Sequence, residues 1–174
     1  ANLLANIRVI GTTLDIQPSD VGVSWLPLYH DMGLIGAWLA PLYFGIPVSI
    51  FSPLAFLARP ERWLWTIHAR RATISPAPNF AYERCARKIA EEDLEGLDLS
   101  SWRVALTGAE PIAPETLAAF QRKLAPYGFR EESFLPVYGL AESSLLLSSS
   151  KQGTAPRIGS FARERLEKER TASP

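Results

Sequence analysis

The sequence predicts an α/β fold in which a mostly parallel sheet carries helices on both faces. Short apolar runs recur along the chain, helical segments separate them, and each run is apolar at nearly every position. Strands buried on both faces have this composition, and strands that alternate with helices are typical of a parallel sheet. The predicted strands are residues 21–26, 48–51, 72–75, 103–107 and 134–138.

The segments around the first strands have the properties of helices. Residues 1–8 have the pattern of a helix interior, and residues 33–44 are apolar on every side, which predicts a buried helix. Pro60 suits the first position of a helix that continues to Arg71. Each of these helices would cover one face of the sheet.

Two later helices are predicted from the spacing of their apolar residues. Residues 79–93 place Ala81, Cys85 and Ile89 four residues apart, so Cys85 is expected in the core. Pro114 opens the last helix and Gly128 is its expected end. The apolar face of that helix consists of Leu117, Phe120, Leu124 and Tyr127.

The composition is that of a globular domain without a charge bias. The 174 residues include 18 Lys and Arg and 18 Asp and Glu, so the formal net charge is zero. No basic field attracts nucleic acid, which we therefore do not expect as a partner. A single cysteine permits no internal disulfide and fits a cytoplasmic location. Two histidines and that cysteine cannot build a typical zinc site without carboxylates.

The longest uncharged stretch, residues 32–58, is long enough to cross a membrane. Glycine and proline interrupt it repeatedly, and the residues after Pro47 have the pattern of a strand. We therefore expect a buried helix, a turn and a buried strand, and no membrane span. Residues 1–8 lack the apolar run of a signal peptide.

The composition changes near residue 150. Residues 148–156 are rich in Ser, Gly and Pro, and the charged residues 163–170 that follow predict a solvated helix. We therefore expect residues 1–150 to form the α/β core, with residues 151–174 as a separate charged segment.

Groups capable of binding a ligand follow four of the predicted strands. They are the segments 27–31, 75–79, 107–111 and 138–142, each with a polar or aromatic side chain and a Gly or Pro. Ligands of open α/β sheets bind beyond the carboxyl ends of the strands. The four segments should therefore line one crevice.

The segment after the fifth strand carries the most informative chemistry. Tyr138 offers a face for stacking on a flat base, and Gly139 allows the backbone to turn tightly. Glu142 offers hard oxygen ligands to Mg²⁺, although glutamate in a first helical turn also simply complements the helix dipole.

Two other segments permit either a functional or a structural interpretation. The backbone at Gly108 is bare enough to hydrogen-bond a nucleotide edge, or it forms a plain turn between strand and helix. His30 could donate to a carboxylate or phosphate, while Asp31 could orient it or cap the following helix. With His68 on a distant helix, these residues do not suggest a metal site.

Four stretches resemble, in order and spacing, those of fatty acyl-AMP ligases, which belong to the adenylate-forming superfamily of acyl-CoA synthetases and adenylation domains. They are residues 23–36 (VSWLPLYHDMGLIG), 75–83 (SPAPNFAYE), 103–112 (RVALTGAEPI) and 136–142 (PVYGLAE). The similarity covers essentially the whole chain. It implies that the chain is an internal part of the large N-terminal domain of such an enzyme.

The resemblance implies a two-step reaction. ATP and a fatty acid first give an acyl-adenylate and pyrophosphate, and the acyl group then passes to the phosphopantetheine thiol of an acyl carrier protein in lipid or polyketide synthesis. By motif match, His30 and Glu142 are the implied catalytic residues: His30 would lie by the acyl carboxylate and α-phosphate, and Glu142 would hold Mg²⁺. The implied nucleotide-binding residues are Gly108, Ala109, Glu110, Tyr138 and Gly139. The implied acyl-tunnel residues are Met32, Gly33, Pro76, Asn79 and Phe80.

Residues 151–174 loosely resemble the start of an insertion that this family associates with preference for a carrier protein over coenzyme A. A long-chain acyl-CoA ligase is therefore the nearest alternative, and amino-acid adenylation a more distant one. The family's phosphate loop, its later ribose-binding Asp and the Lys of its small C-terminal domain are not found in this sequence. We therefore expect the chain alone to be inactive, and a truncated, non-catalytic relic is the alternative from another functional class.

Overall fold

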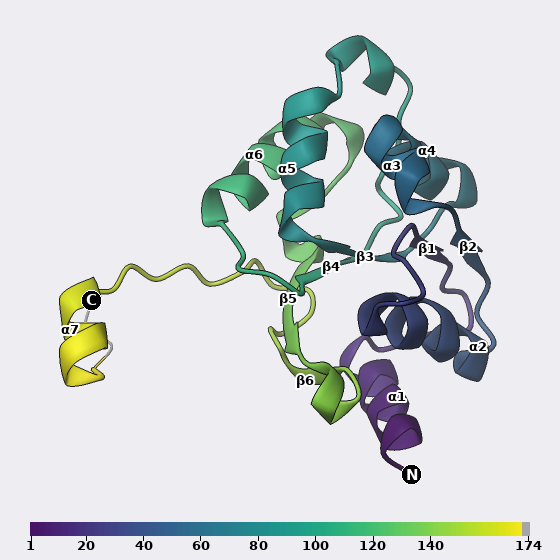
Figure 1. The fold of residues 1–174 in the computed structure, drawn as a ribbon. Helices are drawn as coiled ribbons and strands as arrows, with labels where there is room; N and C mark the ends of the chain where they lie inside the picture. The colour runs from purple at the N-terminus through teal and green to yellow at the C-terminus, as the bar shows by residue number, and fades with distance from the viewer. Residues whose placement is uncertain (172–174) are drawn as a thin grey trace.

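A six-stranded sheet organises the computed structural model, which describes residues 1–171 (Figure 1). Four neighbouring pairs are parallel, and only the last pair, β5 with β6, is antiparallel. The mostly parallel sheet is thus confirmed, and all five predicted strands are present. In spatial order the strands are β2 (Val48–Ile50), β1 (Gly22–Ser24), β3 (Ile74–Pro78), β4 (Val104–Gly108), β5 (Phe134–Gly139) and β6 (Leu146–Ser149).

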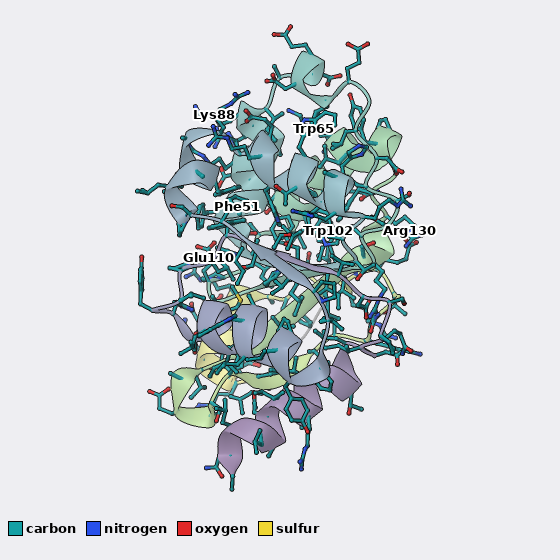
Figure 2. All side chains as sticks on the ribbon, turned by 90° about the vertical axis from the view of Figure 1, so that its right-hand side faces the viewer. Phe51, Trp65, Lys88, Trp102, Glu110 and Arg130 are labelled. Carbon is teal, nitrogen blue, oxygen red and sulfur yellow. The ribbon has the colours of Figure 1, made fainter. Side chains whose placement is uncertain are left out.

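The register of the central strands brings their carboxyl ends to a common edge. Pro78 at the end of β3 lies opposite Gly108 at the end of β4, and Thr107 lies opposite Pro136 of β5. Figure 2 labels Phe51 and Glu110, which follow β2 and β4, on its left side, and Arg130, which precedes β5, on its right. The left side of that view is therefore the carboxyl edge.

Helices cover both faces of the sheet, as Figure 1 shows. One face carries α3 (Pro53–Ala58), α4 (Glu61–Arg70), α5 (Asn79–Lys88) and α6 (Pro114–Leu124). The other carries α1 (Asn2–Thr13), the π-helix η1 (Met32–Leu39) and α2 (Ala40–Phe44). Short 3₁₀ turns complete the chain: η2 (Glu91–Leu94), η3 (Ala125–Tyr127), η4 (Glu131–Ser133) and η5 (Ala141–Ser143).

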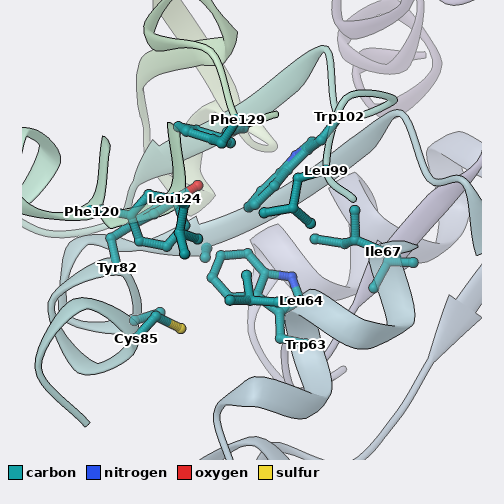
Figure 3. Close-up of a cluster of buried hydrophobic side chains, with 14 of the residues drawn as sticks. Trp63, Leu64, Ile67, Tyr82, Cys85, Leu99, Trp102, Phe120, Leu124 and Phe129 are labelled. Carbon is teal, nitrogen blue, oxygen red and sulfur yellow. The ribbon is translucent and has the colours of Figure 1, made fainter. Parts of the chain in front are cut away.

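Aromatic rings fill the core between the sheet and helices α4, α5 and α6 (Figure 3). The ring of Trp63 packs edge to face against Tyr82 and Trp102, with centroid distances of 5.4 and 5.1 Å. Phe120 packs against Tyr82 at 5.0 Å. Cys85 is buried in the same core, as its position in the sequence predicts, and burial raises the pKa of its thiol.

A buried ion pair lies at the opposite, amino edge of the sheet. Arg103 precedes β4 and donates to both carboxylate oxygens of Asp20, at 2.9 and 2.5 Å. Arg103 also donates to the carbonyl oxygens of Leu14 and Asp15, and Asp20 accepts from Thr73 just before β3. Because Asp20 itself precedes β1, the pair joins the end of α1 to the starts of β1, β3 and β4.

Two predicted helices differ in the structure. The helix predicted at 33–44 is a π-helix followed by α2, and it is not buried all round, because Trp38 and Leu42 point away from the sheet and are exposed. The segment predicted as one helix at 79–93 ends at Lys88, where Ile89 adopts an extended backbone. Helix α3 and strand β6 were not predicted.

The chain after β6 is largely irregular until helix α7 (Arg163–Glu169). Three ion pairs with four-residue spacing join its side chains, and all its residues are exposed, as predicted for a solvated helix. Among residues 1–171, no helix is long and apolar enough to cross a membrane. Nor does this range contain three His, Cys, Asp or Glu side chains grouped as metal ligands.

Candidate functional site

The carboxyl edge of the sheet opens into a cavity of about 250 Å³ between the strands and helices α1 and η1. The walls are mainly apolar, and His30, Asp31 and Tyr138 supply the polar side chains. An apolar slot that ends in a polar edge can hold a ligand with an apolar tail and a polar head. The lining residues are Ile10, Leu14, His30, Asp31, Met32, Gly36, Ile74, Pro76, Leu106, Ala109, Val137, Tyr138, Gly139, Leu140, Leu145 and Leu146.

Tyr138 projects from the end of β5, where the chain makes a tight turn into β6. A side chain at Gly139 would place its Cβ 1.9 Å from the carbonyl oxygen of Leu145, so only glycine fits there. The turn closes where the Leu140 N–H donates to that same oxygen at 3.0 Å. The phenol ring of Tyr138 is exposed beside the cavity, in position to stack on a planar group. Glu142, in η5, is exposed and does not line the cavity.

His30 and Asp31 act together at the start of η1. The Asp31 carboxylate accepts from the Met32 N–H at 2.7 Å and lies 2.8 Å from Nδ1 of His30. The Met32 N–H also lies 3.2 Å from Nδ1 of His30. We assign the Nδ1 proton to the shorter contact with Asp31, because two acceptors would otherwise face each other there. Asp31 therefore caps η1 and orients His30, which leaves Nε2 of the half-exposed imidazole available to a ligand. Both alternatives considered for Asp31 are realised.

Gly33 holds η1 against the end of β1. A Cβ at Gly33 would lie 2.2 Å from the carbonyl oxygen of Pro27, which is backbone and cannot move aside. At Gly36, one turn on, the nearest atom is the tip of the Leu145 side chain at 3.1 Å. Gly33 thus serves close packing and does not line the cavity, whereas Gly36 does.

We expect Gly33→Ala to lower the free energy of unfolding by about 1–3 kcal/mol, because overpacking forces the backbone to shift. Gly36→Ala is the matched control. It should be neutral or slightly stabilising, because alanine favours helix and the Leu145 tip can move. Urea unfolding of both variants measures the difference, and an equal loss in the two would contradict the packing argument.

The segment after β4 divides between the cavity and helix α5. Ala109 has a left-handed backbone with φ of 66° and lines the cavity. Gly108 is buried, and a Cβ added to it would lie 2.7 Å from the carbonyl oxygen of Val137. Glu110 accepts from the Phe80 N–H at 2.6 Å and so binds the first turn of α5. One oxygen of this carboxylate is therefore used within the protein, while the side chain stays exposed.

Asn79 and Phe80 lie on α5 and outside the cavity. The Asn79 side-chain oxygen accepts from the Ala113 N–H at 3.1 Å. The ring of Phe80 is partly exposed and packs edge to face against Trp25 at 5.9 Å. The structure thus brings part of the predicted set to the cavity, namely His30, Met32, Pro76, Ala109, Tyr138 and Gly139.

The floor of the cavity comes from residues that the sequence reasoning missed. Ile10 and Leu14 of α1 and Leu145 and Leu146 of the β5–β6 turn line it. The spacing of Ile7, Ile10 and Leu14 on one helical face was the available signal. It predicts a buried face, but only the folded chain shows that part of this face borders a cavity.

Comparisons with known proteins agree with one another. A sequence model of the family described as AMP-binding enzyme matches residues 1–165. A medium-chain-fatty-acid–[acyl-carrier-protein] ligase, JamA of Moorena producens, is 44% identical over 97% of this chain and 28% of its own length.

Solved structures give the same result. A chain from work on the fatty acyl-adenylate ligases of E. coli and L. pneumophila superimposes with a TM-score of 0.96 at 41% identity, covering 99% of this chain and 31% of that one. The L. pneumophila enzyme in complex with acyl adenylate and pyrophosphate gives 0.89 at 43% identity, covering 94% and 30%. The chain thus spans about 30% of the length of these relatives.

Proposed function

The chain belongs to the AMP-binding enzyme family, and from this we propose that it forms the acyl- and adenylate-binding part of a fatty acyl-AMP ligase. Such an enzyme would join a fatty acid to AMP and pass the acyl group to an acyl carrier protein. The observation that carries the proposal is the cavity, whose apolar slot opens beside His30, Ala109 and Tyr138. An acyl-adenylate has the same division between an apolar tail and a polar head.

The proposed first step is displacement at phosphorus. A carboxylate oxygen of the fatty acid attacks the α-phosphorus of ATP, an O–P bond forms, and the bond to the leaving pyrophosphate breaks. Positioning and neutralisation of charge assist such a step more than covalent catalysis does. We propose that His30, in the imidazolium form that carries a proton on both ring nitrogens, donates from Nδ1 to Asp31 and from Nε2 to the carboxylate or α-phosphate. The ring of Tyr138 would stack on adenine.

The proposed roles of the other residues follow from their contacts. Ala109 would border the nucleotide through its backbone, and Gly108 would support it from the strand end. Met32 and Pro76 would lie along the acyl chain, together with Ile10 and Leu14 from α1. Residues 151–174 would begin the insertion that favours a carrier protein.

A magnesium ion would neutralise the phosphates of ATP. Glu142 fits this group chemically, because Mg²⁺ prefers carboxylate oxygens and is commonly held by one or two of them together with phosphate and water. The carboxylate is exposed in η5, four residues after Tyr138 in the sequence, and makes no ion pair within residues 1–171.

The test of the function is isotope exchange between pyrophosphate and ATP by the full-length protein that contains these residues. Exchange should require a fatty acid, and the acyl group should then appear on a holo acyl carrier protein. Transfer to coenzyme A with little transfer to the carrier would replace the proposal with an acyl-CoA ligase. The absence of any fatty-acid-dependent exchange would reject both.

We expect Glu142→Gln in that full-length protein to reduce adenylate formation steeply while the melting temperature barely changes. Glutamine keeps the size and one carbonyl oxygen but loses the charge that a hard cation prefers. Higher Mg²⁺ should then restore part of the rate. A lowered melting temperature with normal turnover would assign Glu142 to the helix turn alone, where its loss costs no more than about 1 kcal/mol.

A further inference from the structure

The outer face of α5 carries a groove that takes no part in the cavity. The hollow measures about 490 Å³, and we call it the α5 groove; its lining is Phe80, Glu83, Arg84, Arg87 and Lys88. Three of these five side chains are basic and one is acidic, in a chain whose formal net charge is zero. The groove is therefore a local concentration of positive charge.

The positive charge of the α5 groove is only partly neutralised by the protein itself. Arg87 pairs with Glu83 at 2.6 Å while its side chain stays 74% exposed. Arg84 donates to the carbonyl oxygen of Leu57 at 2.5 Å and not to a carboxylate. Within residues 1–171, neither Arg84 nor Lys88 forms an ion pair. The exposed Lys88 and the partly buried Arg84 thus add positive charge that no carboxylate of the described residues neutralises.

Exposed apolar side chains lie in the groove and on the neighbouring helix α3. The bond from Arg84 to Leu57 joins the groove to α3, where Leu54 is 75% exposed and Leu57 is also exposed. Phe80, which lines the groove itself, is also exposed. Exposed apolar groups beside unpaired cations are a common composition of protein interfaces.

The groove begins at the carboxyl edge of the sheet. The Phe80 N–H donates to Glu110, which directly follows the cavity residue Ala109. Lys88 lies about 12 Å further along the helix, at about 1.5 Å per residue. Figure 2 shows Lys88 on the same side of the molecule as Glu110, with Arg130 on the opposite side. A protein bound in the groove would therefore stand beside the edge where the cavity opens.

We propose that the α5 groove is the docking surface for the acyl carrier protein, which would present an acidic helix to it. This inference rests on the proposed function, since it names the surface that brings in the acyl acceptor. In the transfer, the sulfur of the carrier's thiolate attacks the carbonyl carbon of the acyl-adenylate. The C–S bond forms, the bond between that carbon and the phosphate oxygen breaks, and AMP leaves with the electron pair. The thiol proton passes to solvent.

The residues that follow α5 would set the orientation of the carrier. The turn η2 carries Glu91, Glu92 and Asp93. The acidic surface of the carrier would therefore be attracted to α5 and repelled by η2 immediately beyond it. Opposite charges side by side on one surface favour a single docking orientation and raise the rate of association more than the final affinity.

The double variant Arg87→Glu/Lys88→Glu in the full-length protein tests the docking surface. The matched control is Arg70→Glu/Arg130→Glu, which makes the same change in net charge at two exposed positions that precede β3 and β5, at the amino edge. The probes are a holo acyl carrier protein as acceptor, free pantetheine as an acceptor without a protein surface, and pyrophosphate exchange for the first step.

We expect the α5 variant to raise the KM for the carrier at least about tenfold, and the control to change it less than about twofold, with an effect that weakens at high salt. Pyrophosphate exchange and transfer to pantetheine should stay at the wild-type level in both variants, which also shows that both fold. Normal exchange with an unchanged KM for the carrier in the α5 variant would overturn the docking surface alone. Absence of exchange in the unmodified protein would instead reject the proposed function.

Discussion

Replacing Asp20 with alanine should lower the free energy of unfolding by about 3 kcal/mol, the low end of the range for a broken buried ion pair. The Asp20 side chain is 3% exposed, and its loss leaves the Arg103 guanidinium without its carboxylate. The low end applies because Arg103 keeps 24% of its side chain in solvent and retains its bonds to the carbonyls of Leu14 and Asp15. Urea unfolding of the chain measures the loss.

The same carboxylate predicts a pH dependence. Burial alone would raise the pKa of Asp20, but hydrogen bonds from Arg103, Gln17 and Thr73 outweigh it and hold the pKa below its ordinary value of 3.8. The stability that Asp20 contributes is therefore fully present above the ordinary pKa of 3.8, which applies to the unfolded chain, and is lost as the pH falls from there through the lower pKa of the folded protein. In Asp20→Ala, stability should fall less steeply in this acid range.

Asp98→Ala is the control for the ion pair. Asp98 pairs with Arg71 at 2.8 Å, but both side chains are exposed, and exposed pairs contribute little to stability. Its effect on unfolding should be clearly smaller than that of Asp20→Ala. Equal losses in the two variants would show that burial of the Asp20–Arg103 pair is not what makes it important.

Trp63→Ala should have the largest effect in the aromatic core, with a loss of about 3–5 kcal/mol in the free energy of unfolding. Trp63 is fully buried, and its ring packs against Trp25, Phe56, Tyr82 and Trp102. Its indole N–H also donates to the hydroxyl of Ser75 in β3 at 2.8 Å. Alanine would leave a cavity at the junction of α4 with the sheet and remove this bond.

Trp65→Ala, on the same helix, is the control that distinguishes the loss of core packing at Trp63 from the effect of removing any tryptophan side chain. Trp65 is only partly buried, and its indole donates to the carbonyl oxygen of Asp93 at 2.9 Å. Circular dichroism follows unfolding in both variants without relying on tryptophan fluorescence. If Trp65→Ala were as destabilising as Trp63→Ala, the central position of Trp63 would not explain its contribution.

The sequence was sufficient to predict the parallel part of the sheet, because strands buried on both faces leave a continuous apolar run. It did not reveal β6, since Leu146 and Leu147 are followed by three serines that have the composition of a loop. Pairing with β5 across the Gly139 turn stabilises this strand, and such pairing is a tertiary contact.

The edge that carries the candidate site was also predictable, since the strand order of an α/β sheet brings its carboxyl ends together. The assignment of single side chains was less predictable. Glu110 and Asn79 have ligand-binding chemistry in the sequence, and in the fold one side-chain oxygen of each accepts from the N–H of Phe80 or of Ala113. The sequence could not predict these contacts, because they depend on how α5 and the loop after β4 fold against each other.

The buried position of Cys85 makes it possible to measure how often the core beneath α5 opens. The chain has one cysteine, and its thiol is enclosed by the core and held protonated by burial. A thiol reagent can modify it only during the moments when α5 separates from the sheet, since reaction requires an accessible thiolate. The rate of labelling therefore reports how often α5 separates from the sheet. This helix runs from the candidate site along the α5 groove.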